Sequence, residues 1–256
     1  MVHGLSGISS GYDEVVDALG DGADVFRIDL RGHGRSDRAA GTYSVPFYSD
    51  DVTAFIEEVI GEPVVLIGHS LGGVITHHIT ATRPDLVRSA LCEDPPLYFC
   101  DQTLFDQSIM AGVFPLLEKA MRSAQDDGQP RDYFESMVAD AVMPWGRAGD
   151  HMTSRALQSR VDSLMLGDPD VWLPAIHGGA LSGYDPDARI TKPMIILQAD
   201  PHMGPALFPD HAARQHEVNP EIDIRLIDGA PHGVHSFTGS AARYVEAVRD
   251  IIARAS

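Results

Sequence analysis

The chain has 256 residues, of which 44% are hydrophobic and 22% charged, a composition that excludes a disordered or fibrous protein and fits one large folded unit. Its 37 acidic and 19 basic residues give a formal net charge of −18. Such a charge repels phosphate backbones and anionic lipids, so we expect no nucleic-acid partner and no binding to membrane surfaces. No apolar run approaches the roughly 18 residues of a membrane span, and residues 1–11 do not resemble a secretory signal, which predicts a cytoplasmic protein.

Cysteine usage agrees with that compartment. Cys92 and Cys100 are the only two cysteines, too few for a disulfide framework or a four-ligand zinc site, and we expect free thiols. The histidine pairs His77-His78 and His211 with His216 do not place two metal ligands on one helical face. We therefore expect no metal site and no cofactor.

Short apolar, β-rich segments alternate with helical segments along most of the chain. Strands are expected at residues 25–30, 64–67, 89–93, 193–198 and 222–227. Helical periodicity covers residues 52–60, 71–83 and 245–254. This alternation is typical of βαβ units, and it predicts an α/β fold with a mostly parallel sheet flanked by helices.

The strand rhythm stops between about residues 95 and 189, where apolar residues recur at helical spacing. We interpret residues 97–187 as an inserted helical cap, and residues 1–96 and 188–256 as the core. Asp168 and Pro169 supply an N-cap and a first-turn proline for a short helix through Trp172. Large apolar residues that could line a pocket in this region are Phe105, Met110, Phe114, Met137, Trp145, Met165 and Trp172. Trp172 is the best single candidate for substrate binding.

A nucleophile motif follows the expected strand at residues 64–67. Residues 68–72 read Gly-His-Ser-Leu-Gly and open a helix, so GxSxG stands in the strand, turn and helix context that it requires. The flanking glycines let the strand and the helix approach closely. Ser70 is therefore the predicted nucleophile, and the Leu71 N–H at the helix start is a predicted donor to an oxyanion.

A general base and an acid must come from later in the chain if the order is serine, acid, histidine. His232 lies just after the last expected strand and is the predicted base. His235 is interpreted as a structural neighbour and His69 as a residue packed inside the turn. Two carboxylates end expected strands, Asp94 and Asp200, and chain order alone does not choose between them.

With these residues in place, the chain resembles the α/β-hydrolase superfamily over nearly its whole length. The motifs that carry the resemblance are HGLSG, DLRGHGRSD, GHSLGG and GAPHG. The resemblance implies that the Leu5 N–H is the second oxyanion donor and that residues 29–37 are a structural turn. Within the superfamily, RSALCEDPPLYF is similar to the zearalenone lactone hydrolases, which implies that Asp94 is the triad acid. In most other members the acid follows the next core strand, and Asp200 lies about two residues before that usual position.

The start of the chain departs from the family pattern. Members usually have two strands and most of a third before the His-Gly loop, whereas only Met1 and Val2 precede His3. We therefore expect a gap in the sheet beside the strand that leads to Ser70, with missing N-terminal strands from a clipped or misassigned start as the favoured interpretation. Exposed strand edges then predict low stability or a homo-oligomer.

These residues predict a serine hydrolase that cleaves a carboxylic ester or lactone through an acyl-enzyme, with a small molecule as substrate. A hydrophobic or macrocyclic lactone is the favoured substrate class because of the resemblance and the apolar insertion. A thioesterase or a carbon–carbon bond hydrolase would use the same constellation. A small-molecule receptor or sensor that keeps the triad but turns over slowly is the alternative from another class.

Overall fold

The computed structural model describes residues 1–255. The strands are β1 (Val64–His69), β2 (Val87–Glu93), β3 (Val142–Met143), β4 (Gly146–Arg147), β5 (Met194–Ala199) and β6 (Asp223–Ile227). The α-helices are α1 (Asp13–Leu19), α2 (Val45–Phe55), α3 (Leu71–Thr82), α4 (Gln102–Asp106), α5 (Ile109–Asp126), α6 (Arg131–Ala139), α7 (Ala148–His151), α8 (Ser154–Leu166), α9 (Leu173–His177), α10 (Pro209–Val218) and α11 (Ala241–Ala253). Shorter helical turns are η1 (Ser9–Tyr12), η2 (Gly20–Gly22), η3 (Ile56–Ile60), η4 (Pro84–Leu86), η5 (Pro169–Trp172) and η6 (Val234–Ser236).

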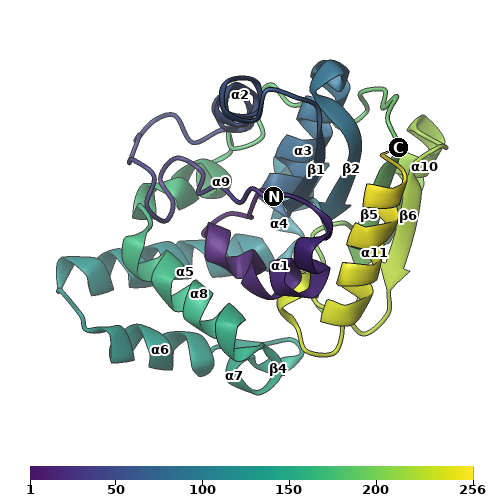
Figure 1. Ribbon diagram of the computed structural model, residues 1–256. Helices are drawn as coiled ribbons and strands as arrows, with labels where there is room; N and C mark the ends of the chain where they lie inside the picture. The colour runs from purple at the N-terminus through teal and green to yellow at the C-terminus, as the bar shows by residue number, and fades with distance from the viewer. Residues whose placement is uncertain (256) are drawn as a thin grey trace.

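The main sheet has the strand order β1-β2-β5-β6, and every neighbouring pair is parallel. Helix α3 packs on one face of the sheet and α11 on the other, as Figure 1 shows. Side chains alternate accordingly: on β2, Ala90 and Cys92 join the core under α2 and α3, whereas Leu91 joins the core under α11. Because all four strands run the same way, their carboxyl ends lie along one edge, where open α/β folds place their sites.

Four of the five expected strands are confirmed, and the one expected at residues 25–30 is wrong. Only Ile28 pairs in this segment, through a single parallel bridge to Val2. The apolar pattern is there, but too little backbone lies beside it to form a ladder. Helix α2 begins at Val45, earlier than expected, because Pro46 occupies its first turn, where the missing N–H costs nothing.

The outer edge of β1 carries one short contact with the chain start. Val2 N–H donates to Ile67 O at 2.8 Å, and His69 N–H donates to Val2 O at 3.1 Å. Toward the start of β1, a hollow of about 590 Å³ lies between the strand and the segment around Phe26 and Ile28. Along this part of the edge, no further strand pairs with β1 among the described residues.

Helices α4 to α9 lie between β2 and β5 in the chain, and Figure 1 shows α5, α6 and α8 grouped beside the sheet. The segment is not purely helical, because β3 and β4 form a small antiparallel pair. The expected cap on the short helix is present as η5, where Asp168 accepts a hydrogen bond from Asp170 N–H at 3.0 Å. None of the helices described within residues 1–255 has the length and apolar character needed to cross a membrane.

Candidate active site

Ser70 lies in a strained turn between β1 and α3. Its φ of 53° and ψ of −118° fall where non-glycine residues are rare. The glycines on either side are required by contact: a Cβ on Gly68 would lie 2.0 Å from Gly72 O, and a Cβ on Gly72 would lie 2.2 Å from Val2 O. The close approach of strand, helix and chain start therefore fixes the turn that carries the serine.

Asp94 lies directly against His232, with 2.6 Å between Asp94 Oδ2 and His232 Nδ1. The Asp94 side chain is fully buried and also accepts backbone hydrogen bonds from Ala206 (2.7 Å), Ala199 (3.1 Å) and Leu207 (3.2 Å). A carboxylate only accepts, so His232 Nδ1 carries the proton and Nε2 is left with its lone pair. That arrangement suits a general base oriented by an acid.

The alternative acid, Asp200, has a different role in the structure. Its carboxylate accepts the backbone N–H groups of His202 and Gly229, both at 2.8 Å. These two hydrogen bonds hold the pKa of the Asp200 carboxyl below its ordinary value. Asp200 thus ties two loops together and makes no hydrogen bond to His232 among the described residues.

His69, which directly precedes Ser70 in the chain, links the nucleophile turn to the His232 loop. The ring of His69, which precedes the serine, lies 4.7 Å from the His232 ring, and its Nε2 donates to His232 O at 3.1 Å. Burial lowers the pKa of His69 to about 3, so the ring stays neutral. No direct hydrogen bond joins Ser70 Oγ to His232 among the described residues; such bonds often tighten only with substrate.

The expected oxyanion donors, Leu5 and Leu71, line the same cavity as Ser70. Gly7 N–H donates to Gly4 O at 2.9 Å and closes a tight turn, in which Ser6 has a φ of 54°. The Leu5 N–H in this turn donates to no group among residues 1–255. Leu71 is the first residue of α3, so its N–H lacks a partner within the helix. Both amides are free to bind a developing negative charge.

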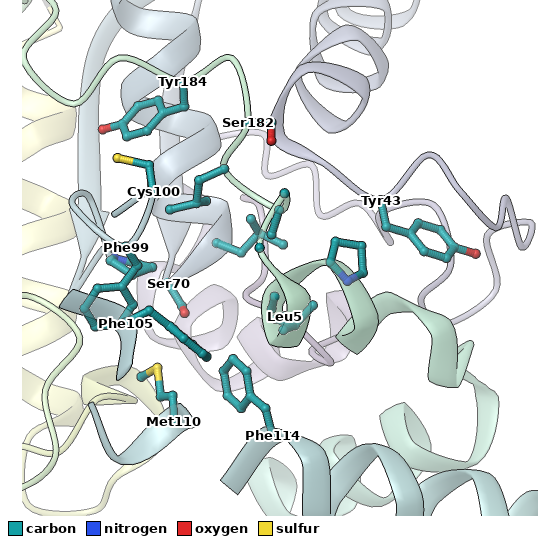
Figure 2. Close-up of a pocket in the computed structure, with 18 of the residues that line it drawn as sticks. Leu5, Tyr43, Ser70, Phe99, Cys100, Phe105, Met110, Phe114, Ser182 and Tyr184 are labelled. Carbon is teal, nitrogen blue, oxygen red and sulfur yellow. The ribbon is translucent and has the colours of Figure 1, made fainter. Parts of the chain in front are cut away.

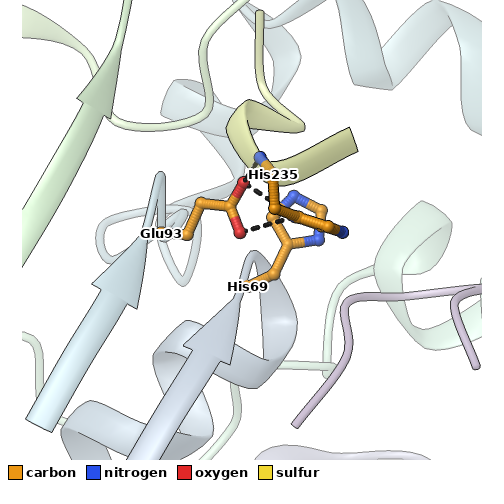
Figure 3. Close-up of side chains that lie close together, drawn as sticks. All are labelled: His69, Glu93 and His235. Atoms are coloured by element: carbon orange, nitrogen blue, oxygen red, sulfur yellow. Dashed lines mark hydrogen bonds and ion pairs between the residues drawn. The ribbon is translucent and has the colours of Figure 1, made fainter. Parts of the chain in front are cut away.

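Glu93, the residue before Asp94, forms a second acid–histidine pair with His235, which Figure 3 shows together with His69. Glu93 is fully buried and accepts hydrogen bonds from His235 Nδ1 at 2.7 Å and from the His235 N–H at 2.9 Å. Burial alone would raise the pKa of Glu93, but His235 and His69 hold it below its ordinary value. His69, Glu93 and His235 place possible metal-ligand atoms within 4.8 Å of one another. Protein hydrogen bonds already use the carboxylate, so the group holds the loop that carries His232.

Ser70 opens into a cavity of about 320 Å³ (Figure 2). Figure 2 shows Phe99, Phe105, Met110 and Phe114 around it. The lining residues are Leu5, Tyr43, Tyr48, Ser70, Leu71, Pro96, Phe99, Cys100, Gln102, Phe105, Met110, Phe114, Val171, Pro174, Ala175, Gly178, Gly179, Ala180, Leu181, Ser182, Gly183 and Tyr184. None of these side chains carries a formal charge.

The expected substrate residues divide into two groups. Phe105, Met110 and Phe114 line the cavity, whereas Met137, Trp145, Met165 and Trp172 do not. Trp172 is buried behind the wall, where its ring packs on Phe114 with 4.9 Å between centroids. Its expected contact with a ligand therefore remains a prediction that this geometry does not favour.

Sequence reasoning missed the glycine-rich wall at residues 178–184. Gly178, Gly179 and Gly183 all have positive φ. A cluster of glycines in the sequence indicates a loop. Nothing in the local sequence indicates that this loop faces Ser70. Residues 29–37 were expected to be scaffold, and in the structure His33 Nε2 accepts the Ser6 N–H at 3.1 Å, next to the oxyanion turn.

Comparisons with known proteins agree with this architecture. A family model described as alpha/beta hydrolase fold matches residues 1–139. The 2-(acetamidomethylene)succinate hydrolase of Mesorhizobium japonicum is 24% identical over 234 residues, which cover 91% of this chain and 80% of the relative. An esterase from Exiguobacterium antarcticum has a TM-score of 0.72 at 16% identity, covering 98% of this chain and 89% of that one. The enol-lactonase from Burkholderia xenovorans LB400 has a TM-score of 0.63 at 17% identity with the same coverage.

Proposed function

We propose, because the chain belongs to the α/β-hydrolase fold family, that it is a serine hydrolase which cleaves carboxylic esters or lactones through an acyl-enzyme. The observation that carries the proposal is the joint geometry of the site. A strained serine opens into an uncharged cavity, and the His232 loop next to it is held by Asp94 at 2.6 Å. Each part fits acyl transfer, and no cofactor is needed for it.

The mechanism follows from the atoms that are free. His232 Nε2 takes the proton of Ser70 Oγ as the oxygen bonds to the substrate carbonyl carbon, and the carbonyl oxygen becomes an oxyanion bound by the Leu5 and Leu71 N–H groups. The protonated His232 then gives this proton to the departing alcohol oxygen as the carbon–oxygen bond breaks. Water repeats the sequence on the acyl-enzyme and releases the acid. For a lactone, acid and alcohol remain in one molecule.

The cavity favours a hydrophobic, uncharged substrate. The name of the Mesorhizobium relative indicates a succinate derivative, a class with two carboxylates. Here no lining side chain could pair with a carboxylate, and an unpaired buried charge is costly. The apolar lining and the similarity of RSALCEDPPLYF to zearalenone lactone hydrolases therefore support a hydrophobic ester or macrocyclic lactone.

A substrate panel with a nucleophile variant tests the proposal. The protein should turn over aryl esters with apolar acyl groups and a hydrophobic macrocyclic lactone steadily. It should not turn over a substrate that carries two carboxylates. Ser70→Ala should lower kcat by about 10³-fold or more in a folded protein, because the triad acts as a unit. A fluorophosphonate should label Ser70 in the unmodified protein.

The other outcomes point to other functions. Turnover only of thioesters or carbon–carbon substrates would replace the ester and lactone assignment. A single burst without turnover, together with stabilisation by ligand, would favour the sensor. Phosphonate labelling at any residue other than Ser70 would overturn the nucleophile assignment itself.

A further inference from the structure

Ser6, the residue after the oxyanion donor Leu5, is held at three of its atoms by residues distant in sequence. Its N–H donates to His33 Nε2, and its carbonyl oxygen and hydroxyl both accept from Arg160 Nη1. The distance from Arg160 Nη1 to Ser6 O is 2.7 Å. Ser6 is buried and has a φ of 54°, a conformation that costs about 1–3 kcal/mol for a residue other than glycine. These contacts offset the strain and fix the turn.

Arg160 comes from α8, which lies in the helical segment between β2 and β5 and beside α1 (Figure 1). Burial lowers the pKa of its guanidinium to about 10, so it remains protonated near neutral pH. No carboxylate pairs with it among the described residues, although the chain as a whole is strongly acidic. Arg160 is half-buried, and a cation partly removed from water without an anionic partner is unfavourable, so its position beside this turn needs an explanation.

Packing alone does not hold the oxyanion turn. A hollow of about 120 Å³ borders the turn, and its lining includes Gly4, Leu5, Gly7 and Arg160. The turn could relax toward this space if the hydrogen bonds to Ser6 were lost, and the Leu5 N–H would then move with it. A donor must be aimed at the oxyanion position in advance to lower the barrier.

We propose that Arg160 is a positioning residue for the oxyanion turn: its hydrogen bonds to Ser6 aim the Leu5 N–H, and its unpaired charge favours the oxyanion. The inference rests on the proposed serine-hydrolase function. It predicts that the helical segment contributes to the chemical step, in addition to lining the substrate cavity.

The test compares Arg160→Met with Arg155→Met in the purified full chain. Arg155 lies on the same helix and is half-exposed, and it pairs with Asp17 rather than Ser6, so it controls for loss of a charge from α8. Arg160→Met should lower kcat by about 10²-fold and leave KM within about threefold, as for loss of one oxyanion donor. Arg155→Met should stay within about twofold in both constants. Arg160→Lys keeps the charge and one donor and should recover about tenfold of the loss.

Binding of a trifluoromethyl ketone separates positioning from general packing. Its adduct with Ser70 carries an oxyanion, so Arg160→Met should weaken its inhibition by the same factor as kcat, while a non-covalent apolar inhibitor should bind unchanged. If Arg160→Met does not fold by circular dichroism, Ser6→Ala removes the hydroxyl contact and should lower kcat about fivefold at constant KM. A folded Arg160→Met with kcat within threefold of the parent would overturn the inference, as would an unchanged Ser6→Ala. An unmodified protein that neither turns over esters nor labels at Ser70 would instead refute the proposed function.

Discussion

Three residues other than glycine have positive φ among residues 1–255, and all three belong to the site. They are Ser6 beside the proposed oxyanion donor Leu5, the proposed nucleophile Ser70, and the proposed acid Asp94. Each such conformation costs about 1–3 kcal/mol and persists only where the surroundings impose it. Here those surroundings are Arg160 and His33 for Ser6, and the glycine contacts for Ser70. The strain at Ser6 is thus held by residues distant in sequence, whereas the glycines that shape the Ser70 turn lie beside it in the chain.

The two candidate acids can be separated by one matched pair of substitutions. Asp94→Asn should lower kcat by about 10⁴-fold, because an amide can donate to His232 Nδ1 and stabilise the wrong tautomer, as the equivalent change does in serine proteases. Asp200→Asn weakens only the loop contacts to His202 and Gly229, so it should change kcat by less than about tenfold. Steady-state kinetics on an aryl ester near neutral pH measure both. A larger loss for Asp200→Asn would reverse the assignment.

At the scale of the elements, the site depends on how closely α3 approaches the chain start. Gly72→Ala would place a Cβ 2.2 Å from Val2 O, so α3 and the chain start must move apart, which disturbs the turn that carries Ser70. We expect the free energy of unfolding to fall by about 2 kcal/mol or more, with loss of ester hydrolysis. Gly112→Ala on α5 is the control, because nothing lies within 4 Å of its added Cβ. That variant should be neutral or stabilised by up to about 1 kcal/mol in urea unfolding. Equal stability of the two variants would contradict the close-approach argument.

The elements around the nucleophile could be predicted because their signals are local. The apolar run before Gly68 and the glycines around Ser70 specify strand, turn and helix within a few residues. The segment at residues 25–30 has a similar apolar pattern but forms no strand, since a strand also needs a partner and only Val2 reaches it. The same limit explains why Arg160 was missed: its contact with Ser6 spans 154 positions of sequence.

At the scale of the whole molecule, the two faces of the sheet carry separate apolar cores. The face under α2 and α3 continues into the helical segment, and its core includes Tyr48, Phe134 and Trp172. The other face is closed by α11 and η1 and holds Tyr12 and Tyr244 beside the Glu93–His235 pair. The loops that carry the proposed catalytic residues follow the carboxyl ends of the strands. The hollow along β1 leaves part of this strand edge unpaired among the described residues. The homo-oligomer expected from such an edge remains a prediction.

The core also contains buried histidines that are neutral in the folded protein. We therefore expect the protein to lose stability in acid. Burial lowers the pKa of His3 and His77 to about 4 and of His33 to about 3. His3 and His33 each use Nε2 to accept a backbone N–H, from Leu30 and Ser6, so protonation breaks these contacts.

Proton binding by these histidines determines how the free energy of unfolding changes with pH. The folded pKa of each histidine lies below its unfolded value of about 6.5, so the unfolded chain binds more protons between these values and stability falls as the pH drops through them. Each histidine contributes up to about 1.4 kcal/mol per pH unit in that window, and full stability is reached above about pH 6.5. Urea unfolding in steps of about one pH unit from about 7.5 to about 4.5 should show a flat region and then a steep decline. Below about pH 6.5, His77→Gln should reduce the slope of the unfolding free energy against pH by the contribution of one histidine, up to about 1.4 kcal/mol per pH unit. His216→Gln, at an exposed position on α10, should leave this slope unchanged. Constant stability across this whole pH range would show that these rings are not held neutral by the fold.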